Sequence, residues 1–301
     1  MATRLAKTAA GAGTEAELVA EIRVALPEHG LSHDLRAISI VWRRELIRFR
    51  TDRLRAITSL VQPFLFLFVL GTGLSTLAKG GLPAGVNFKT FIYPGVLGMS
   101  VLFTSVFSAG SIVWDREFGF LREMLVAPVR RASLVIGKCL GGATIATFQG
   151  IVFLALAWFA HVPYNPLLLL TLVGELLLLS FTLTAFGLMM AARIKQFQSF
   201  MALTQMLVMP LFFLSGALYP LNGLPAWLSV LTRIDPLTYI IGPMRHSVFD
   251  HLKLPAASVQ RLAPNITWGS WSVPVGLALG IVAAMGLVMI GVAIAEFRKT
   301  E

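Results

Sequence analysis

Long stretches without a charged residue are the feature that most restricts how this chain can fold. Asp, Glu, Lys and Arg are absent from 56–78, 90–114, 139–174, 196–232 and 262–295. A helix needs about 20 consecutive apolar residues to cross the hydrocarbon core of a bilayer. Each of the two shorter stretches therefore predicts one membrane-spanning helix, and each longer stretch leaves room for a span and a connection.

The stretch 139–174 is too long for one span, and its segment 161–166 contains two prolines that mark a turn. We therefore predict two antiparallel spans there, and Pro274 in the first turn of the last span. The result is an all-α polytopic membrane protein with six transmembrane helices. The predicted spans are 56–78, 90–114, roughly 137–160, roughly 167–192, a part of 196–232 that ends near Tyr219-Pro220, and a part of 262–295 that starts at Ser272.

Composition supports the same class of protein. Of the 301 residues, 56% are hydrophobic and 13% are charged, whereas soluble domains have about 25% charged residues. The formal net charge is +10, and basic residues beside apolar spans are typical of membrane topology. We therefore expect the lipid bilayer, and no nucleic acid, as a partner.

The distribution of Lys and Arg predicts the orientation. If the N-terminus is cytosolic, 19 of the 25 Lys and Arg residues fall in segments on the cytosolic side. Such an excess is the usual mark of cytosolic segments. Six spans return Arg298 and Lys299 to the cytosol, so we predict a multi-pass protein of the cell inner (plasma) membrane with both termini cytosolic.

The segment 34–55 predicts a basic amphipathic helix that lies in the membrane interface. Residues 1–33 precede it as a flexible cytosolic N-terminus, and 56–298 form the transmembrane domain. The helix is a topology anchor alone, or a lever that also contacts a cytosolic partner. Its predicted apolar side comprises Leu35, Ile38, Trp42, Leu46 and Phe49, and its predicted polar side comprises Arg36, Arg43, Arg44 and Arg50.

Two further segments differ from plain spans. Between spans 2 and 3, Phe118, Leu121 and Leu125 share one face of a short amphipathic helix, which Pro128 ends. Between spans 5 and 6, 214–249 is too apolar for an external loop and too broken by Gly and Pro for one helix. We predict short re-entrant or outer helices there, which start at Pro225 and again after Asp235-Pro236.

Two sets of residues resemble the signatures of ABC type-2 permeases, and most of all those of the daunorubicin/doxorubicin-resistance permease group. The resemblance covers roughly 34–298. The first set comprises Asp115-Arg116-Glu117, Gly119, Leu121, Pro128, Arg131 and Gly137-Lys138. The second comprises Phe213-Leu214-Ser215-Gly216, Tyr219-Pro220, Leu224-Pro225, Trp227-Leu228 and Asp235-Pro236-Leu237-Thr238-Tyr239.

This resemblance implies an exporter in which two copies of the chain, a homodimer, form the path and two copies of a cytosolic ABC ATPase supply energy. The coupling helix at 115–127 would dock on the ATPase through Asp115, Arg116, Glu117, Phe118, Gly119, Leu121, Arg122 and Leu125. The interfacial connecting helix would use Trp42, Arg43, Arg44 and Arg50. The outer gate would comprise Tyr219, Pro220, Trp227, Pro236 and Tyr239.

The chain is not expected to be an enzyme. It lacks a GxxxxGK[ST] phosphate loop, so ATP and magnesium would bind to the partner ATPase and this chain would carry no cofactor. Cys139 is the only cysteine, which excludes an intramolecular disulfide and a cysteine-built metal site. No catalytic arrangement of residues stands out.

The expected cargo is a hydrophobic or amphipathic compound, such as a drug, an antibiotic or a lipid-like metabolite, which implies drug efflux and antibiotic resistance. Export of a glycolipid or polysaccharide is the alternative within the family. Glu175 lies well inside span 4, where a carboxylate is costly. It is a packing residue, part of the pathway opposite Gln149, or the proton site of an ATP-independent carrier.

Aromatic and methionine side chains of spans 2 and 5 pack, face lipid or line a cavity for apolar cargo. The candidates are Phe103, Phe107, Met201, Met206, Met209, Phe212 and Phe213, of which Phe107, Met206 and Phe213 are assigned to the pathway with Glu175 and Gln149.

Overall fold

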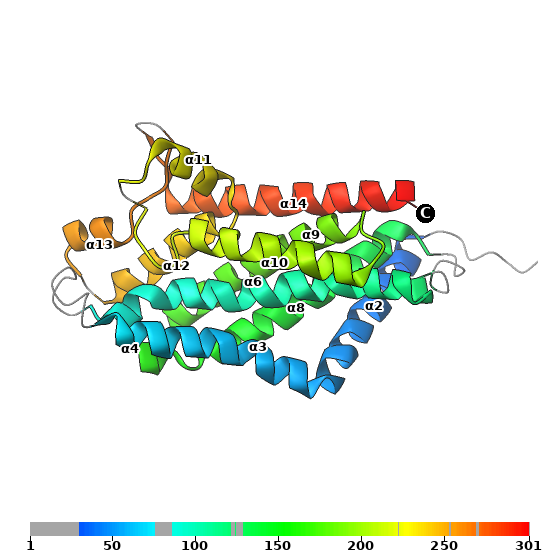
Figure 1. Cartoon of the computed structure of the whole chain (residues 1–301), viewed down its shortest axis with the longest axis horizontal. Helices are drawn as coiled ribbons and strands as arrows, with labels where there is room; N and C mark the ends of the chain where they lie inside the picture. The colour runs from blue at the N-terminus through cyan, green and yellow to red at the C-terminus, as the bar shows by residue number, and fades with distance from the viewer. Residues whose placement is uncertain are drawn as a thin grey trace, which may run out of the picture.

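Six long apolar helices run alongside one another and form the body of the molecule (Figure 1). They confirm the predicted all-α polytopic fold. The computed structural model describes residues 30–75, 86–121, 124, 129–221, 223–252, 254–268 and 271–300. In this part of the chain the helices able to span a membrane are Ala56–Gly73, Phe88–Glu117, Arg131–Leu154, Pro166–Ala191, Phe197–Leu214 and Val275–Lys299.

The first span is built from three consecutive helical pieces, and shorter helices connect several of the others. The elements that lead up to and form spans 1–3 are α2 (Leu31–Thr51), α3 (Arg53–Leu65), the π turn η1 (Phe66–Leu70), α4 (Gly71–Gly73), α6 (Phe88–Glu117), α8 (Arg131–Leu154) and the 3₁₀ turn η2 (Ala157–Ala160). The remaining elements are α9 (Pro166–Ala191), α10 (Phe197–Leu214), α11 (Ala226–Ile234), α12 (Thr238–His251), α13 (Ala256–Leu262), β1 (Thr267–Trp268), β2 (Trp271–Ser272) and α14 (Val275–Thr300).

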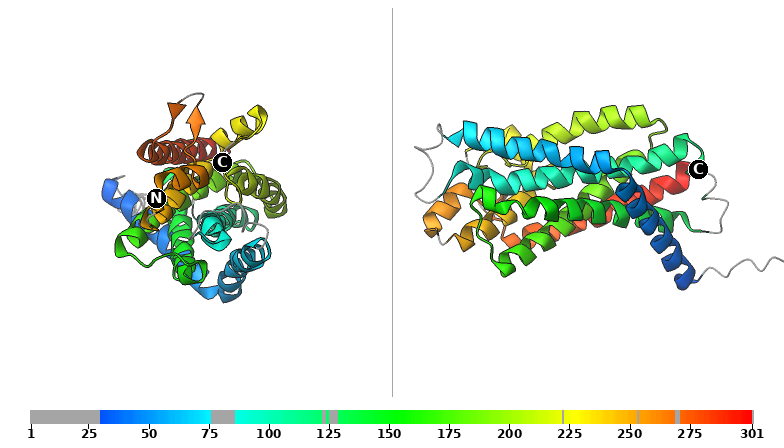
Figure 2. Two further views of the ribbon diagram at one scale, coloured as in Figure 1. Left: turned by 90° about the vertical axis from the view of Figure 1, so that its left-hand side faces the viewer. Right: turned by 90° about the horizontal axis from the view of Figure 1, so that it is seen from below.

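Helix α6 is the centre of the bundle. It packs against α3, α8, α9, α10 and α12, and 83% of its apolar 18-residue segment is buried. The apolar 18-residue segments of the first span, α10 and α14 are only 17%, 22% and 22% buried. These three helices lie at the outside of the bundle (Figures 1 and 2), so their apolar faces are available to lipid or to another protein chain.

Glycines allow the central helices to approach closely. A Cβ atom on Gly187 of α9 would lie 2.7 Å from the Cβ atom of Ala109 on α6. A Cβ atom on Gly142 of α8 would lie 2.7 Å from the side chain of Thr184 and 2.9 Å from that of Ser108. Small residues are the usual means of close helix packing in membranes, where no hydrophobic force favours association.

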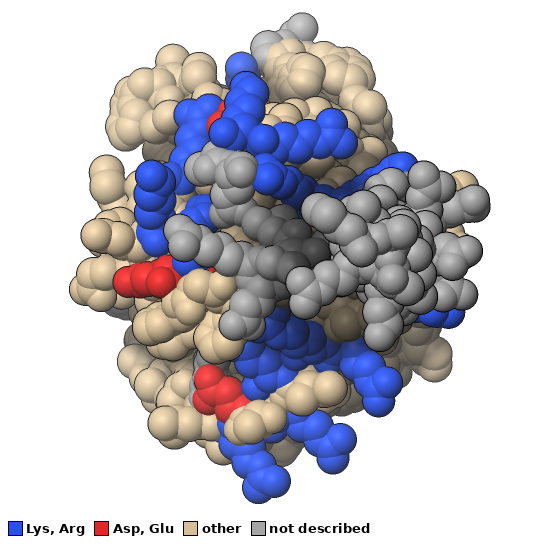
Figure 3. All heavy atoms as spheres, turned by 90° about the vertical axis from the view of Figure 1, so that its right-hand side faces the viewer, with Lys and Arg blue, Asp and Glu red and all other residues tan. Residues whose placement is uncertain are grey.

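The two ends of the bundle differ in charge and in structure. One end carries α2, the C-terminal end of α6 and the last turn of α14, and Lys and Arg side chains gather over it (Figures 1 and 3); we call it the basic end. The opposite end carries α11, α12 and α13 (Figure 1), and we call it the distal end. Exposed basic residues of the segments at the basic end are Arg36, Arg43, Arg50, Arg53, Arg130, Arg193, Lys195, Arg298 and Lys299.

Several predicted boundaries are wrong, and local chemistry explains each difference. The fifth span ends at Leu214 rather than near Tyr219-Pro220, because a turn follows in which Gly216 has a φ of +72°. The sixth begins at Val275, after the β1–β2 hairpin, rather than at Ser272. The carbonyl oxygen of Pro274 accepts hydrogen bonds from the backbone N–H groups of Leu277 and Ala278 in the first turn, so this proline precedes the helix.

The predicted amphipathic helix at 34–55 is present as α2, which crosses the basic end at an angle to the spans (Figure 2). It begins earlier than predicted and ends at Thr51, and α3 starts at Arg53. The predicted end of the first span, 76–78, lies outside the described residues.

The predicted short helices at the distal end are also present, as α11 and α12. Between them Asp235 is buried, and its carboxylate accepts hydrogen bonds from the backbone N–H of Leu237 at 3.0 Å and from the Thr238 hydroxyl at 3.2 Å. Burial nevertheless raises the pKa of Asp235 to about 7. The folded protein therefore favours the protonated form of this side chain.

Stability of the distal end should fall as the pH rises. Asp235 binds a proton more tightly when folded, so its contribution is fully present below its ordinary pKa, near 4, and is lost as the pH rises to about 7. We predict that Asp235→Asn removes this pH dependence. Thermal unfolding of the purified protein in detergent measures it at about pH 4, the lower edge of that window, and at about pH 8, above its upper edge.

Asp250→Asn, at an exposed carboxylate of α12, is the control and should keep the wild-type pH dependence. An Asp235→Asn protein whose stability changes with pH as much as the wild type would contradict the prediction.

Candidate functional site

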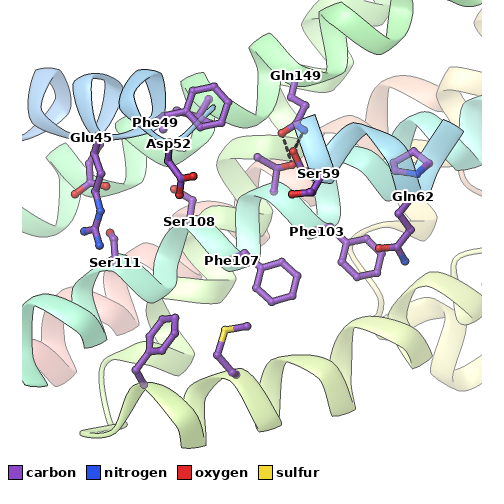
Figure 4. A pocket seen from close by; sticks show the side chains of 17 residues that line it. Glu45, Phe49, Asp52, Ser59, Gln62, Phe103, Phe107, Ser108, Ser111 and Gln149 are labelled. Atoms are coloured by element: carbon purple, nitrogen blue, oxygen red, sulfur yellow. Dashed lines mark hydrogen bonds between the residues drawn. The ribbon is translucent and has the colours of Figure 1, made fainter. Parts of the chain in front are cut away.

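A cavity of about 400 Å³ lies between α2, α3, α6, α8 and α10 (Figure 4). Its apolar lining consists of Phe49, Pro63, Phe103, Phe107, Ile145, Phe197 and Met201. Its neutral polar lining consists of Thr58, Ser59, Gln62, Thr104, Ser108, Ser111 and Gln149. Apolar walls with a few placed polar groups are typical of sites for small organic molecules.

Charged side chains gather at one end of the cavity. Glu45, Arg48 and Asp52, all from the region of α2, line that end. Gln62 and Phe103 lie at the other end (Figure 4). The charged groups of the lining are therefore confined to the end near the basic end of the bundle, where Phe49, Ser108 and Ser111 also lie, and Gln62 and Phe103 lie further into the bundle (Figure 4).

Gln149 joins three helices at the wall of the cavity. Its side-chain oxygen accepts a 2.6 Å hydrogen bond from the Thr104 hydroxyl of α6, and its NH₂ group donates to the Ser59 hydroxyl of α3 (Figure 4). A buried amide needs such partners, because an unpaired one is costly. Gln149 and Glu175, which were expected to face each other across the hairpin, each form hydrogen bonds to other helices.

A cluster of ion pairs lies next to the charged end of the cavity, and we call it the Lys138 cluster. Lys138 Nζ of α8 lies 2.8 Å from Glu45 Oε1 of α2 and 2.7 Å from Asp115 Oδ2 of α6. Asp115 Oδ1 also lies 3.3 Å from a guanidinium nitrogen of Arg44 and 3.6 Å from one of Arg48. Three cations and two anions thereby join three helices.

The centre of this cluster is removed from solvent. The side chains of Lys138 and Asp115 are each 1% exposed and that of Glu45 is 5% exposed. The Ser111 hydroxyl, 3.1 Å from Lys138 Nζ, provides a further polar contact. Removing one partner of a buried ion pair leaves an uncompensated charge and costs about 3–5 kcal/mol, so the cluster fixes how α2 sits against the bundle.

The predicted coupling residues Asp115, Arg116 and Glu117 form the last turn of α6, and the side chain of each bonds to another part of the bundle. Arg116 donates to the carbonyl oxygens of Ala191 at 3.1 Å and Ile194 at 2.7 Å, just where α9 ends. Glu117 Oε2 accepts a 2.7 Å hydrogen bond from the backbone N–H at the start of α10. These side chains therefore tie the basic ends of the helices together.

The chain turns immediately after α6, so the predicted helix at 115–127 is interrupted at Gly119, and Phe120, Leu121 and Met124 beyond the turn are again helical. Gly119 has a φ of +82°, which breaks the helix. Phe118 is 55% exposed and stands at the surface, whereas Leu121 is buried. Arg122 and Leu125 lie outside the described residues.

The predicted apolar and polar sides of α2 do not coincide with its buried and exposed sides. Its buried residues are Ala37, Val41 and Glu45, while Leu35 is 65% exposed. Arg44, predicted on the polar side, turns inward to Asp115. The ion pairs and the close approach of glycines on α8 set this register. Val41 and Glu45 lie directly over Gly137 and Gly141.

The other predicted residues of this helix have separate positions. Trp42 Nε1 donates a 3.1 Å hydrogen bond to the Thr144 hydroxyl of α8. Arg43 and Arg50 are exposed.

Glu175 is buried against α12 and does not line the cavity. Its Oε1 atom accepts a 3.2 Å hydrogen bond from the Ser247 hydroxyl, and only 4% of the residue is exposed. In the described part of the chain its Oε2 atom has no hydrogen-bond partner. This arrangement agrees with a residue that packs α9 against the distal helices.

The predicted pathway residues of spans 2 and 5 divide into two groups. Phe107 lines the cavity, as do Phe103 and Met201. Met206 is 72% exposed and Phe213 is 49% exposed, on the outer side of α10 and away from this cavity lining.

The predicted outer-gate residues lie at the distal end. The hydroxyl of Tyr219 donates to Phe213 O at 2.8 Å, and that of Tyr239 donates to Arg233 O at 2.9 Å. Trp227 is 66% exposed. Pro236 is buried in the turn before α12, and Pro220 is exposed.

Sequence reasoning missed the partners Lys138 and Glu45, as well as Arg245. Lys138 begins an apolar span and looks like a topology signal, and no motif links it to an acid 93 residues away. Arg245 is buried at the distal end, where its guanidinium donates to the carbonyl oxygens of Gly216 at 2.9 Å and Ala217 at 3.1 Å. Burial lowers the pKa of Arg245 to about 9.

Comparison with known proteins agrees with this architecture. A putative transport permease, ycf38, from Cyanophora paradoxa is 28% identical over 213 residues, covering 70% of this chain and 73% of the relative. Nodulation protein J from Rhizobium leguminosarum bv. trifolii is 26% identical over 215 residues, covering 70% and 80%. The probable multidrug ABC transporter permease YbhR from Escherichia coli (strain K12) is 28% identical over 156 residues, covering 51% and 42%.

A model of the family described as "ABC-2 type transporter" matches residues 36–249. This segment includes α2, five of the six spans, the Lys138 cluster and the cavity lining. It covers more than half of the chain, and the chain therefore belongs to the ABC-2 type transporter family.

Proposed function

We propose that this chain is the transmembrane subunit of an ATP-driven exporter of a hydrophobic or amphipathic compound. The observation that carries the proposal is the polarised cavity, in which aromatic walls (Phe103, Phe107) lead to an ionic end (Glu45, Asp52). An amphipathic molecule matches such a surface, because its apolar part and its polar part find different surroundings. The name of the relative YbhR, a probable multidrug permease, supports this choice of cargo.

We place the basic end in the cytosol. Exposed Lys and Arg gather there (Figure 3), and positive charge is enriched on the cytosolic side of membrane proteins. Both termini would then be cytosolic. The ATPase, with its own ATP and magnesium, would bind at this end, where Phe118 and Phe120 are 55% and 47% exposed.

A second copy of the chain would complete the path. The first span and α10 border the cavity and expose apolar side chains. Val69 is 63% exposed and Met206 is 72% exposed. These faces are suited to a homodimer contact as well as to lipid.

The Lys138 cluster supplies a physical route from the ATPase to the cavity. The turn that exposes Phe118 directly follows Asp115, which pairs with Lys138, and Glu45 belongs to both the cluster and the cavity lining. A displacement of the basic end of α6 would therefore move α2, and with it one end of the cavity. Rigid elements joined by ion pairs can carry such coupling.

Transport by reconstituted protein tests the proposal. Vesicles that contain the chain and its ATPase should accumulate a fluorescent anthracycline, used as an amphipathic probe, only when ATP is supplied. Thr58→Phe, which narrows the cavity, should lower uptake by about tenfold, the effect of roughly 1.4 kcal/mol. Thr171→Phe, an exposed position of α9 outside the cavity lining, should leave it unchanged.

The alternatives give different results in the same assay. Uptake by this chain alone, driven by a proton gradient and abolished by Glu175→Gln, would replace the exporter with a proton-coupled carrier. Stimulation of ATP hydrolysis by a glycolipid or polysaccharide, but not by the anthracycline, would indicate the other class of cargo.

Docking at Phe118 generates a separate prediction. Phe118→Ala should weaken association with the ATPase by about 2 kcal/mol, as for a buried aromatic anchor of an interface, and should uncouple ATP hydrolysis from transport. Copurification of the two subunits and the ratio of transport to hydrolysis measure these effects. Phe148→Ala is the matched control, because Phe148 is 57% exposed but lies on α8 within the span.

A Phe118→Ala protein that copurifies with the ATPase and couples normally would place the contact elsewhere. Substitution of Glu117 is less informative, since Glu117 also holds the start of α10.

A further inference from the structure

The outward face of α2 carries two parallel stripes of side chains. Arg36, Arg43 and Arg50 are exposed and recur every seven residues, so their Cα atoms are spaced about 10 Å apart along the helix axis. Beside them Ile40 and Ile47 are 62% and 57% exposed. Side chains seven positions apart lie on nearly the same side of a helix.

This face contains no acidic residue. The two acids within α2 turn toward the bundle instead. Asp34 pairs with Arg130 at 3.4 Å and accepts a hydrogen bond from Ser133 at 3.1 Å, and Glu45 belongs to the Lys138 cluster. The outward face is therefore both cationic and apolar along its whole length.

The apolar stripe continues onto a membrane span. Leu54, at the start of α3, is 74% exposed, and the exposed side chains Ile57, Val61 and Leu65 follow it along the first span at 62%, 46% and 52%. Exposed apolar side chains thus occur along α2 and again along the first span, where they are suited to contact with acyl chains.

We propose that the outward face of α2 binds the headgroups of anionic phospholipids in the leaflet at the basic end. The three arginines would bind lipid phosphates, and Ile40, Ile47 and Leu54 would lie among the upper acyl chains. Basic and apolar side chains together are the combination that an anionic membrane surface attracts. An acidic protein surface would leave the exposed isoleucines without partners, which favours lipid. The inference concerns the membrane rather than the cargo, and it stands whichever compound is carried.

Lipid charge would then act on the site through α2. The inward face of the same helix carries Arg44, Glu45 and Arg48, which belong to the Lys138 cluster, and Glu45 and Arg48 also line the cavity. Anchoring the outward face would hold these residues in place.

Hydrogen exchange of the full chain in lipid nanodiscs tests the proposal. Discs of phosphatidylcholine alone are compared with discs that contain an equal part of phosphatidylglycerol. Phosphatidylglycerol should slow the exchange of backbone amides in 31–51 by about fivefold, the effect of roughly 1 kcal/mol. Salt near 1 M should reverse the effect, because it screens charges beyond about 3 Å.

Variants then locate the interaction. Neutralising the three arginines (Arg36→Gln, Arg43→Gln, Arg50→Gln) should abolish the slowing, and replacing them with lysine should retain it. The matched control neutralises three exposed cations on other elements of the same end (Lys195→Gln, Arg298→Gln, Lys299→Gln) and should exchange as the wild type does.

Three results would overturn the proposal. The first is that segment 31–51 of the wild type exchanges at the same rate in both kinds of disc. The second is that phosphatidylglycerol still slows exchange in the arginine-to-glutamine variant, and the third is that the control variant loses this slowing as well. Protection that appears only after the ATPase is added would assign this face to a protein partner instead. If the glutamine variant does not fold, the salt dependence of the wild type still decides the question.

Discussion

The arrangement of the basic end depends on the ion pairs of the buried Lys138 ammonium group with Glu45 and Asp115. A lone ammonium group would be very costly in this position, and two carboxylates within 2.8 Å make it tolerable. Because those carboxylates come from α2 and α6 while Lys138 belongs to α8, neutralisation of one charge requires three helices to meet. Packing against the glycines of α8 then holds α2 at a register in which Glu45 reaches Lys138. The position of a surface helix is thus set from the interior.

Helix α2 consequently connects the interior of the bundle with its outer surface. Its inward side contributes to both the cluster and the ionic end of the cavity, and its outward side is basic and apolar. The last turn of α6 plays the corresponding role for the other helices, because Arg116 and Glu117 hold the adjoining ends of α9 and α10. Residues that sequence motifs assign to contact with an ATPase are therefore also the residues that hold the bundle together.

The number and type of spans could be predicted from the sequence, because the free-energy cost of placing a charged side chain in lipid depends on that residue alone and not on its distant partners. Charge-free runs therefore located all six helices, and Gly and Pro located the broken distal segment. Pairing between distant residues was beyond such reasoning. The hydrophobic pattern of α2 put Leu35 on an apolar side and Arg44 on a polar side, yet Leu35 is exposed and Arg44 pairs with the buried Asp115. In the same way, Gln149 and Glu175 lie at similar depth but bond to different helices, and Gly119 interrupts a face that looked continuous from Phe118 onward.

A double-mutant cycle on Lys138 and Asp115 tests the central claim most directly. Unfolding free energies are measured for the wild type, Lys138→Met, Asp115→Asn and the double variant in the same detergent. The account predicts that Lys138→Met alone costs about 3–5 kcal/mol, and that the double variant costs less than the sum of the two single changes by more than about 1 kcal/mol. Lys195→Met, an exposed cation at the same end, should cost less than about 0.5 kcal/mol. Additive effects of the two single changes, within about 0.5 kcal/mol, would contradict the claim that this buried ion pair holds the basic end together.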